Sequence, residues 1–452
     1  MSFVALLVTL SLCQIAWILL GVLWVARKHD EIPLLISTLL FYVFTFRFWA
    51  LLQGWALPVN LSNLGFDPID SKSALDVQAI ATLAETVLLS VYMLAQRRRI
   101  DVPDKLASAE LLDWLKPRAV ALAVICIFIS LWARRSVGMQ IASGKSMGFE
   151  VSSYLSLFSL SLVGVAILIA ALWKSRAFRA GGETFLASLL FVVIIYLTFQ
   201  SGMRFQFLGW CVAVTIILSS GQSVVRRGQV LVIGLVGAVG LFAVAGALRN
   251  TEDPTVELEQ SAWERFAFAE DANMLDGFVL LRQVYPWLLE YSYGGEHLEI
   301  FERPIPRAWW PDKPVGGYMN KLGIITADTG FTLGISPSLF GSFYQEGGLV
   351  GVLFLSMIYG FGFGRLVSFS TRIVPLAGLL IRGILAAAIV PLLRGGDLPG
   401  IYAWFGMSFW PCFLLLWLRR RDFFARIPHQ RQFASAVPVR LERGLSGEHS
   451  LV

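Results

Sequence analysis

Several basic residues lie before or within the longest polar stretch of the chain, residues 250–348. Arginine and lysine bind phosphate groups without a metal, and the planar fork of arginine fits two phosphate oxygens at once. A passive role competes with this one, since cations at a membrane edge often reach into lipid headgroups or pair with carboxylates. The candidate phosphate ligands are Arg204 and Arg249 before the stretch, and Arg282, Arg303, Arg307 and Lys313 within it.

Carboxylates in the same stretch are candidates for a general base. Glu346 is the most interesting of them, because it lies beside the flexible pair Gly347-Gly348 at the end of the stretch. His297 is the one histidine of the stretch, and we expect its side chain to be solvated. A solvated or ion-paired role competes for each carboxylate. The other acidic candidates are Glu264, Glu270, Asp271, Glu302, Asp312 and Asp328.

Aromatic residues accompany these charges. Trp309 and Trp310 lie between prolines and are the best candidates for stacking on a sugar ring, with Asp312, Lys313 and Tyr344 as further substrate contacts. An interfacial aromatic belt of a membrane protein is the competing explanation for most of the aromatic residues.

The composition places these residues in a membrane protein. Hydrophobic residues make up 56% of the chain, charged residues only 15%, and the mean hydropathy is +0.67. Repeated apolar runs of about twenty residues predict an all-α polytopic protein, since lipid offers no partner for an open backbone. No nucleotide-binding motif or metal-ligand cluster occurs, so we expect no cofactor and no metal, and the basic charge does not indicate nucleic acid. The four cysteines fall inside predicted spans and form no disulfide pattern.

Hydropathy predicts about eleven spans. Eight of them form an N-terminal bundle over 1–249, the large loop follows over 250–348, three spans occupy 349–418, and a basic cytoplasmic tail covers 419–452. The predicted spans are approximately 3–25, 32–55, 76–96, 118–133, 150–173, 184–200, 205–220, 229–248, 349–368, 373–393 and 400–418.

The distribution of Lys and Arg orients this bundle. If loop 26–31 is cytoplasmic, the loops on its side and the tail hold most of the basic residues. The N-terminus is then outside, the C-terminus is cytoplasmic, and residues 250–348 face the periplasm or the cell exterior.

Helical spacing within the large loop predicts two short interfacial helices, over 258–275 and 276–291, with Asp276 as N-cap of the second and a kink at Pro286. Charges inside the spans should face the bundle interior. Arg47 and Glu85 lie at similar depth on adjacent spans, and we predict that they pair, in either a structural or a substrate-binding role. Arg382 is the third such charge.

Three short patterns add a family resemblance. Ser201-Gly202-x-Arg204 closes one span, and the large loop holds Ile305-Pro306-Arg307-x-x-Trp310-Pro311-Asp312-Lys313-Pro314. Gly341-x-x-Tyr344-x-x-Gly347-Gly348-x-x-Gly351 leads into the next span. Together these patterns resemble Wzy-type polymerases of O-antigen and exopolysaccharide repeat units.

The resemblance implies a GT-C-like fold and metal-independent transfer of a growing glycan from undecaprenyl pyrophosphate onto the next lipid-linked repeat unit. Arg204, Arg249, Arg307 and Lys313 would then hold the pyrophosphate, Glu346 would accept the acceptor proton, and the wide loop would bind the glycan. The partners would be undecaprenyl-pyrophosphate-linked glycans, the lipid bilayer, and a chain-length regulator and flippase of the same pathway.

Other functions compete with polymerisation. A related O-antigen ligase, or another GT-C glycosyltransferase with a lipid-linked donor, would share the fold. Ligases place a histidine in the large loop near the following span, and no histidine lies between His297 and that span, which favours the polymerase. A transporter or flippase of lipid-linked glycans is a third hypothesis, although we find no internal repeat of the kind many transporters have. A loop that only binds a partner protein is a fourth.

Overall fold

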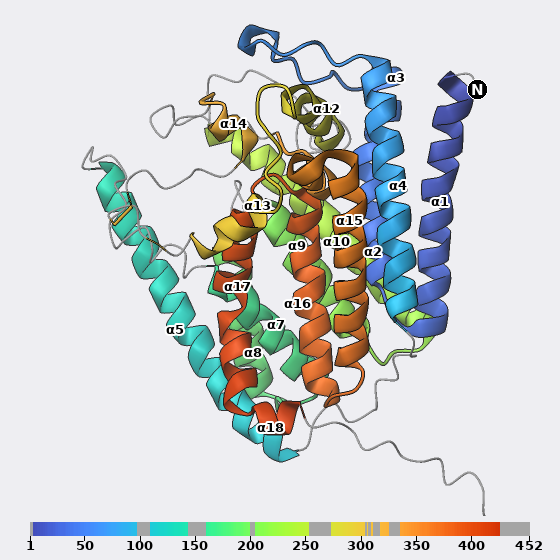
Figure 1. Cartoon of the computed structure of the whole chain (residues 1–452). Coiled ribbons are helices and arrows are strands. Elements are labelled where there is room, and N and C mark those ends of the chain that lie inside the picture. Colours follow the sequence, from blue (N-terminus) through green and yellow to red (C-terminus); the bar gives the residue numbers. More distant parts are fainter. Residues whose placement is uncertain are drawn as a thin grey trace, which may run out of the picture.

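The computed structural model is all-helical over the residues it describes, and no strand occurs among them (Figure 1). Seven of its helices are long and apolar enough to cross a membrane. The described residues are 3–96, 109–142, 160–198, 204–252, 273–302, 305, 309–310, 317–324 and 335–424, without the side chains of 134, 136–142, 204–206, 239 and 241–252.

The seven long apolar segments agree with the hydropathy pattern, because apolar runs of this length can satisfy their backbone in a membrane only as helices. Three shorter apolar helices lie beside them, α7 (Ser161–Lys174), α8 (Gly182–Thr198) and α9 (Arg204–Ser219), together with α10 (Val224–Glu252). The seven are α1 (Phe3–Lys28), the segment α2 (Ile32–Leu40), η1 (Phe41–Phe46) and α3 (Arg47–Leu52), then α4 (Ser71–Ala95), α5 (Ala109–Ala142), α15 (Ser338–Ser370), α16 (Pro375–Arg394) and α17 (Leu398–Leu418).

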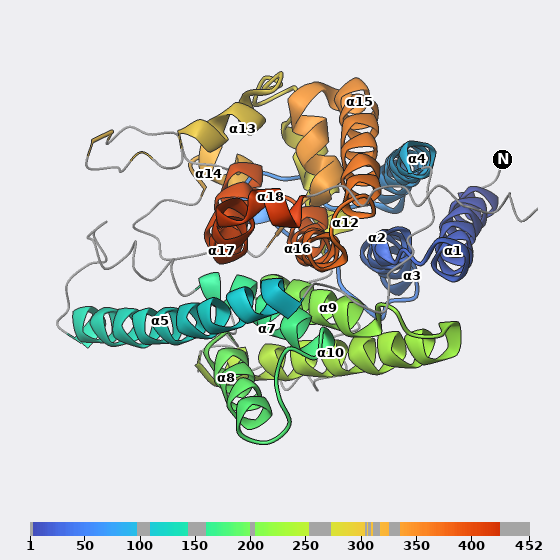
Figure 2. The same ribbon diagram turned by 90° about the horizontal axis from the view of Figure 1, so that it is seen from below.

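Two groups of helices make the bundle. Seen from below, α5, α7, α8, α9 and α10 lie on one side, and α1, α2, α15 and α17 lie on the other (Figure 2). Helix α16 packs against both groups through α9, α7, α15 and α2, and nearly all its side chains are buried. Helix α1 lies at the edge of the molecule (Figure 1).

Among the described helices, α4 and α15 make the most extensive contact, and their backbones lie close together. At Gly360 and Gly364 of α15, an added Cβ would lie only 2.3 Å from the Leu88 carbonyl oxygen and 2.5 Å from that of Tyr92. Small residues four apart let two helix backbones approach each other in this way. The position of α15, which carries Glu346 and Tyr359, is thereby fixed by direct contact with α4.

The large predicted loop is partly helical and packs on the bundle. Helices α12 (Met274–Val284) and α14 (Tyr318–Lys321) lie at the end of the bundle where α4 begins (Figure 1). Helix α13 (Gly295–Leu298) and the short helix η5 (Glu299–Phe301) pack against α17. Helix α15 starts at Ser338, so the C-terminal end of the predicted loop, from 338 to 348, is already part of this helix. The loop is therefore shorter than predicted, at least on its C-terminal side.

The prediction for the second loop helix was wrong in its bounds, its N-cap and its interfacial position. The helix predicted over 276–291 spans 274–284, because Pro286 ends it instead of kinking it. Its N-cap is Asn273, and Asp276 is buried. Nearly all residues of α12 are buried against α15, α4 and η1, so this helix belongs to the protein core and is not interfacial. The other predicted interfacial helix, over 258–275, falls almost entirely outside the described residues.

Helix α5 begins at Ala109 and continues through Pro117.

Candidate functional site

A break in α15 creates the most polar group of contacts near the large loop. Gly347 and Gly348 have non-helical backbone angles, and Gly348 has φ of 61°. The break frees the carbonyls of Gln345 and Glu346, which accept hydrogen bonds from the backbone N–H groups of Ser292 and Tyr293 at 3.0 and 2.9 Å. An added Cβ at Gly348 would lie 2.8 Å from the Tyr291 hydroxyl, so glycine is required there on steric and conformational grounds. Segment 291–294 is thereby held against the start of α15.

Glu346 is at the centre of this contact. Its Oε2 accepts hydrogen bonds from the Ser292 hydroxyl at 3.0 Å and from the Gly294 N–H, and its Oε1 lies 2.7 Å from Nδ1 of His297. The side chain is only 3% exposed. Because both oxygens are occupied and shielded, Glu346 itself is poorly placed to take a proton from a substrate.

His297 is the accessible member of the pair. Its side chain is 26% exposed, and Nε2 lies 2.8 Å from the Tyr359 hydroxyl. In the tautomer with its proton on Nδ1, His297 donates a hydrogen bond to Glu346, and Nε2 can accept one from a hydroxyl group. A carboxylate that orients a histidine, whose other nitrogen faces a hydroxyl, is the arrangement that general-base catalysis needs. We call His297 and Glu346 the outer dyad.

The prediction that His297 is a solvated loop residue was therefore wrong. Its partner is 49 residues away in the chain and becomes its neighbour only through the break at Gly347-Gly348. The Tyr293-Gly294-Gly295 turn just before His297 was the available sequence signal, since Gly294 has a left-handed conformation and its N–H reaches Glu346.

A lysine fixes the helix that carries His297. Lys321 of α14 pairs with Glu296 and Glu299, which lie on either side of His297 in the chain, the second at 3.1 Å. Burial lowers the pKa of Lys321, but the two carboxylates outweigh burial and raise that pKa above its ordinary value. Lys321 is thus a cation that links α14 to α13 and η5.

Aromatic rings border the dyad. The predicted substrate contact Tyr344 is half-buried, with its ring 5.6 Å from Phe278 and 6.1 Å from Tyr291. Burial raises the pKa of Tyr291 and of Tyr285 to about 12, so both hydroxyls stay protonated at neutral pH. The ring of Tyr402 lies 6.1 Å from that of His297. Tyr344 therefore packs within an aromatic cluster, and its contact with a substrate stays a prediction.

Most of the predicted phosphate ligands cannot be placed. Arg303, Arg307, Asp312 and Lys313 lie outside the described residues. Arg204 begins α9 and Arg249 lies near the end of α10, but their side chains are also outside the described part. Trp309 is exposed and Trp310 half-buried. Arg282 is on α12, 3.7 Å from Asp76 in a partly exposed ion pair.

The predicted pair between Arg47 and Glu85 does not form. Arg47 instead binds the buried Asp276 of α12 at 2.7 Å, and it also donates to the Leu57 carbonyl at 2.8 Å. Asp276 accepts a further hydrogen bond from the Val59 N–H at 3.0 Å. The pair attaches α12 to the second membrane segment, and Arg47 is therefore not the partner of Glu85.

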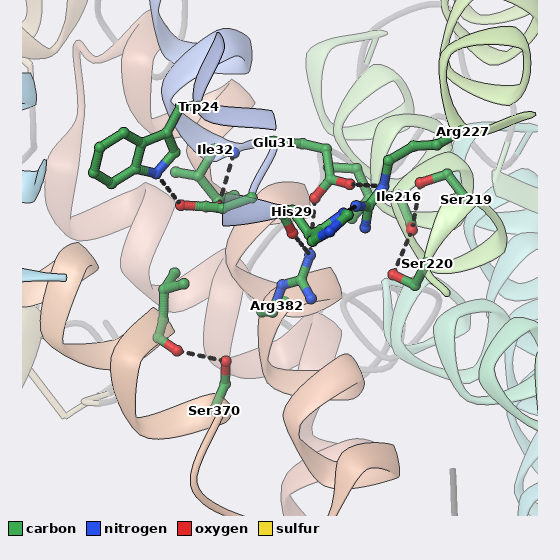
Figure 3. Close-up of polar contacts among 12 residues, drawn as sticks. Trp24, His29, Glu31, Ile32, Ile216, Ser219, Ser220, Arg227, Ser370 and Arg382 are labelled. Atoms are coloured by element: carbon green, nitrogen blue, oxygen red, sulfur yellow. Dashed lines mark hydrogen bonds and ion pairs between the residues drawn. The ribbon is translucent and has the colours of Figure 1, made fainter. Parts of the chain in front are cut away.

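A second buried group of charges lies at the opposite end of the bundle. Figure 3 shows Glu31 between Arg227 and Arg382, at 2.9 and 2.8 Å. Arg227 also contacts Nδ1 of His29 at 2.5 Å, and Arg382 donates to the His29 carbonyl at 3.2 Å. All three charged side chains are nearly inaccessible. This group, which we call the inner cluster, attaches the turn between α1 and α2 to α10 and α16.

Arg382 thus faces the bundle interior, as expected for an intramembrane charge. Within the described ranges, no group of three or more His, Cys, Asp or Glu side chains is arranged to hold a metal ion. Comparisons with family models, with curated proteins and with solved structures gave no match to this chain.

Proposed function

We propose that the protein is a membrane glycosyltransferase that joins undecaprenyl-pyrophosphate-linked oligosaccharide repeat units into a surface polysaccharide at the outer leaflet. The observation that carries the proposal is the outer dyad, a partly exposed histidine oriented by a buried carboxylate beside the large loop. The family resemblance over residues 200–360 supplies the substrate class.

The chemistry follows from the dyad. An acceptor sugar hydroxyl takes the place of the Tyr359 hydroxyl at Nε2 of His297. His297 removes its proton as the new glycosidic C–O bond forms, and Glu346 stabilises the imidazolium that results. The bond between the donor sugar and the pyrophosphate breaks, and the lipid pyrophosphate leaves.

The leaving group gains negative charge, so cations must lie near it. Arg204, Arg249, Arg307 and Lys313 are our candidates, with Arg282, Arg303 and the Trp309-Trp310 pair for the rest of the substrate. In this proposal Glu346 orients the base and does not act as the base itself.

The proposed function includes a membrane topology. We propose that α7, α8, α9 and α10 also cross the bilayer, which gives about eleven crossings in a GT-C-like arrangement. Loops that this topology assigns to one side do meet: Arg227 contacts Glu31 at the inner end, and Gln283 accepts the Asp67 N–H at the outer end. The outer dyad then faces the periplasm or exterior, and the C-terminus is cytoplasmic.

A ligase is the second candidate. The absence of a histidine close to the following span argued against it, but His297 contacts Tyr359 of that very helix. The same dyad would then activate a hydroxyl of a different final acceptor. The two functions differ in the acceptor and not in the bond chemistry.

The test is the lipid-linked glycan profile of cells that carry His297→Ala or Arg307→Ala at confirmed wild-type protein levels. We expect single repeat units to accumulate and long polymer to disappear. Leu298→Ala is the matched control, because Leu298 is the exposed neighbour of His297 on the same short helix.

Other profiles would decide against the polymerase. Normal polymer in His297→Ala would exclude the dyad as its site. Long lipid-linked polymer that never reaches its final acceptor would favour the ligase, and loss of all outward-facing repeat units would favour a flippase.

A further inference from the structure

Glu85 is a buried carboxyl that the proposed glycosyl transfer does not use. It lies at mid-height of α4 and is completely buried. Neither of its oxygens has a hydrogen-bond partner among the described residues, and no ion pair there includes it. The cation predicted for it, Arg47, is bound to Asp276.

The surroundings of Glu85 are polar but uncharged. Gln14 of α1 is its polar neighbour, and the Gln14 amide oxygen accepts from the hydroxyl of Thr45 on η1. That hydroxyl accepts in turn from the Gln78 amide at 2.6 Å. Gln14, Thr45 and Gln78 are all buried, so three membrane segments place their polar side chains at one point inside the bundle.

The segment that supplies Thr45 is a π-helix, Phe41–Phe46. Such short insertions in α-helices occur frequently at functional sites. Thr86, the residue that follows Glu85 on α4, accepts a hydrogen bond at 3.0 Å from Trp17 of α1. This hydrogen bond holds α1 against α4 next to Glu85.

Other charged groups on the elements around α4 are engaged elsewhere. Arg282 of α12 pairs with Asp76, Arg365 of α15 lies over the Phe361 ring, and Glu346 binds His297. The remaining ionisable side chains on these elements are Cys13, Arg27 and Lys28 of α1, Tyr42 of η1, and Tyr344 and Tyr359 of α15. None of them pairs with Glu85 in the described structure.

We propose that Glu85 is a proton-binding site inside the membrane, and that α1 packs against α4 only while this carboxyl carries its proton. Without a cation beside it, an ionised carboxylate next to the uncharged Gln14 amide is strongly unfavourable in an apolar interior. The protonated acid is neutral and gains an O–H donor for the amide of Gln14. Loss of the proton would place an unpaired anion between α1 and α4, and α1, at the edge of the bundle, is the element that can move away (Figure 1).

Infrared difference spectroscopy of the reconstituted protein tests the protonation state directly. At neutral pH we expect a carboxylic acid C=O band in the wild type that is lost in Glu85→Gln. Glu183→Gln is the matched control, since Glu183 is exposed and paired with Lys116 at 3.1 Å and should leave that band unchanged. A Glu85→Gln spectrum that retains the complete acid band would overturn the proposal.

Thermal unfolding supplies a second, independent readout. The amide introduced by Glu85→Gln copies the shape of the neutral acid without its ionisation. This variant should therefore unfold at a higher temperature than the wild type, by a margin that grows as pH rises above the ordinary glutamate range. A lower unfolding temperature for Glu85→Gln at neutral pH would mean that the fold needs the charge, and the proposal would be wrong.

Discussion

The two ends of the bundle use a carboxylate and a histidine in opposite ways. At the outer dyad, Glu346 is surrounded by uncharged donors and one histidine, and the histidine is partly exposed. In the inner cluster, Glu31 lies between two arginines, and the charged side chains are buried.

This difference separates a structural role from a chemical one. A buried carboxylate between two guanidinium groups is held by both of them, and it joins three parts of the chain at one point. The outer dyad has a partly exposed histidine whose Nε2 lies beside the Tyr359 hydroxyl, and in the proposed function a substrate hydroxyl takes the place of that hydroxyl. The inner cluster should therefore determine stability, and the outer dyad should determine activity.

Removal of the central carboxylate of the inner cluster should give the largest effect on stability. Glu31→Ala leaves Arg227 and Arg382 without their shared partner, and breaking a buried ion pair costs about 3–5 kcal/mol. Unfolding in detergent, by heat or by denaturant, measures this loss. Asp422→Ala is the control, because its pair with Arg419 is exposed. If Glu31→Ala loses as little stability as Asp422→Ala, the inner cluster does not have the structural role assigned to it.

His297→Ala should give the largest effect on activity. General-base catalysis contributes roughly 10²–10⁴-fold to a rate, and we expect a loss in that range. Stability should change little, because the side chain is partly exposed. Initial rates of glycan joining, together with the unfolding temperature, measure both quantities. If His297→Ala unfolds at a lower temperature and keeps its specific activity, His297 has a structural role and the assignment of activity to the outer dyad is wrong.

Glu346→Gln should lower the rate less than His297→Ala. The amide oxygen still accepts from Ser292 and Gly294, but the negative charge that stabilises the imidazolium is lost. The double variant should be no slower than His297→Ala alone, because the two residues act as one unit. Additive losses in this double-mutant cycle would show that Glu346 acts independently of His297.

The stability of the protein should also depend on pH, through Asp30 at the inner end of the bundle. Burial raises the pKa of this carboxyl above 3.8, although Arg382 and the Tyr92 hydroxyl oppose the shift. The folded protein thus holds its proton to higher pH than the unfolded chain, so stability should fall as pH rises from about 3.8 through the raised value. Asp30→Asn should remove this slope. Unfolding temperatures from acid to neutral pH measure it, and parallel curves for the two proteins would contradict the assignment.

The smallest effect should come from Arg282→Gln. Its contact with Asp76 at 3.7 Å is partly exposed, and such pairs contribute about 0–1 kcal/mol to stability. Arg382→Gln, the matched change in the inner cluster, should cost several times more. A reduced rate of glycan joining in Arg282→Gln with unchanged stability would support its predicted contact with substrate.

Hydropathy predicted the long apolar helices, because each depends on the local sequence alone. Contacts between residues that are distant in the chain were harder to predict from the sequence. Arg47 and Glu85 have suitable depth and opposite charge, yet Arg47 binds Asp276, which is 229 residues away and was assigned to an interfacial helix. The number of apolar residues on α12 could not distinguish burial in protein from burial in lipid.

One residue of the outer dyad was selected from the sequence, and the other was not. Glu346 was singled out for its place beside Gly347-Gly348, but the prediction of its role missed the histidine that the break brings to it. The candidate phosphate ligands Arg204, Arg249, Arg307 and Lys313 rest on residue type and resemblance, because phosphate binding depends on a three-dimensional arrangement that spacing does not determine.

The most direct test of the account is a reaction with purified, reconstituted protein and a synthetic undecaprenyl-pyrophosphate-linked repeat unit. Lipid pyrophosphate release and product length should be followed together, without nucleotide and with a metal chelator present. We predict that one undecaprenyl pyrophosphate is released for each repeat unit added, and that His297→Ala slows both processes at least about 100-fold. Equal rates for His297→Ala and the wild type, or no bond formation by the wild type, would contradict the account.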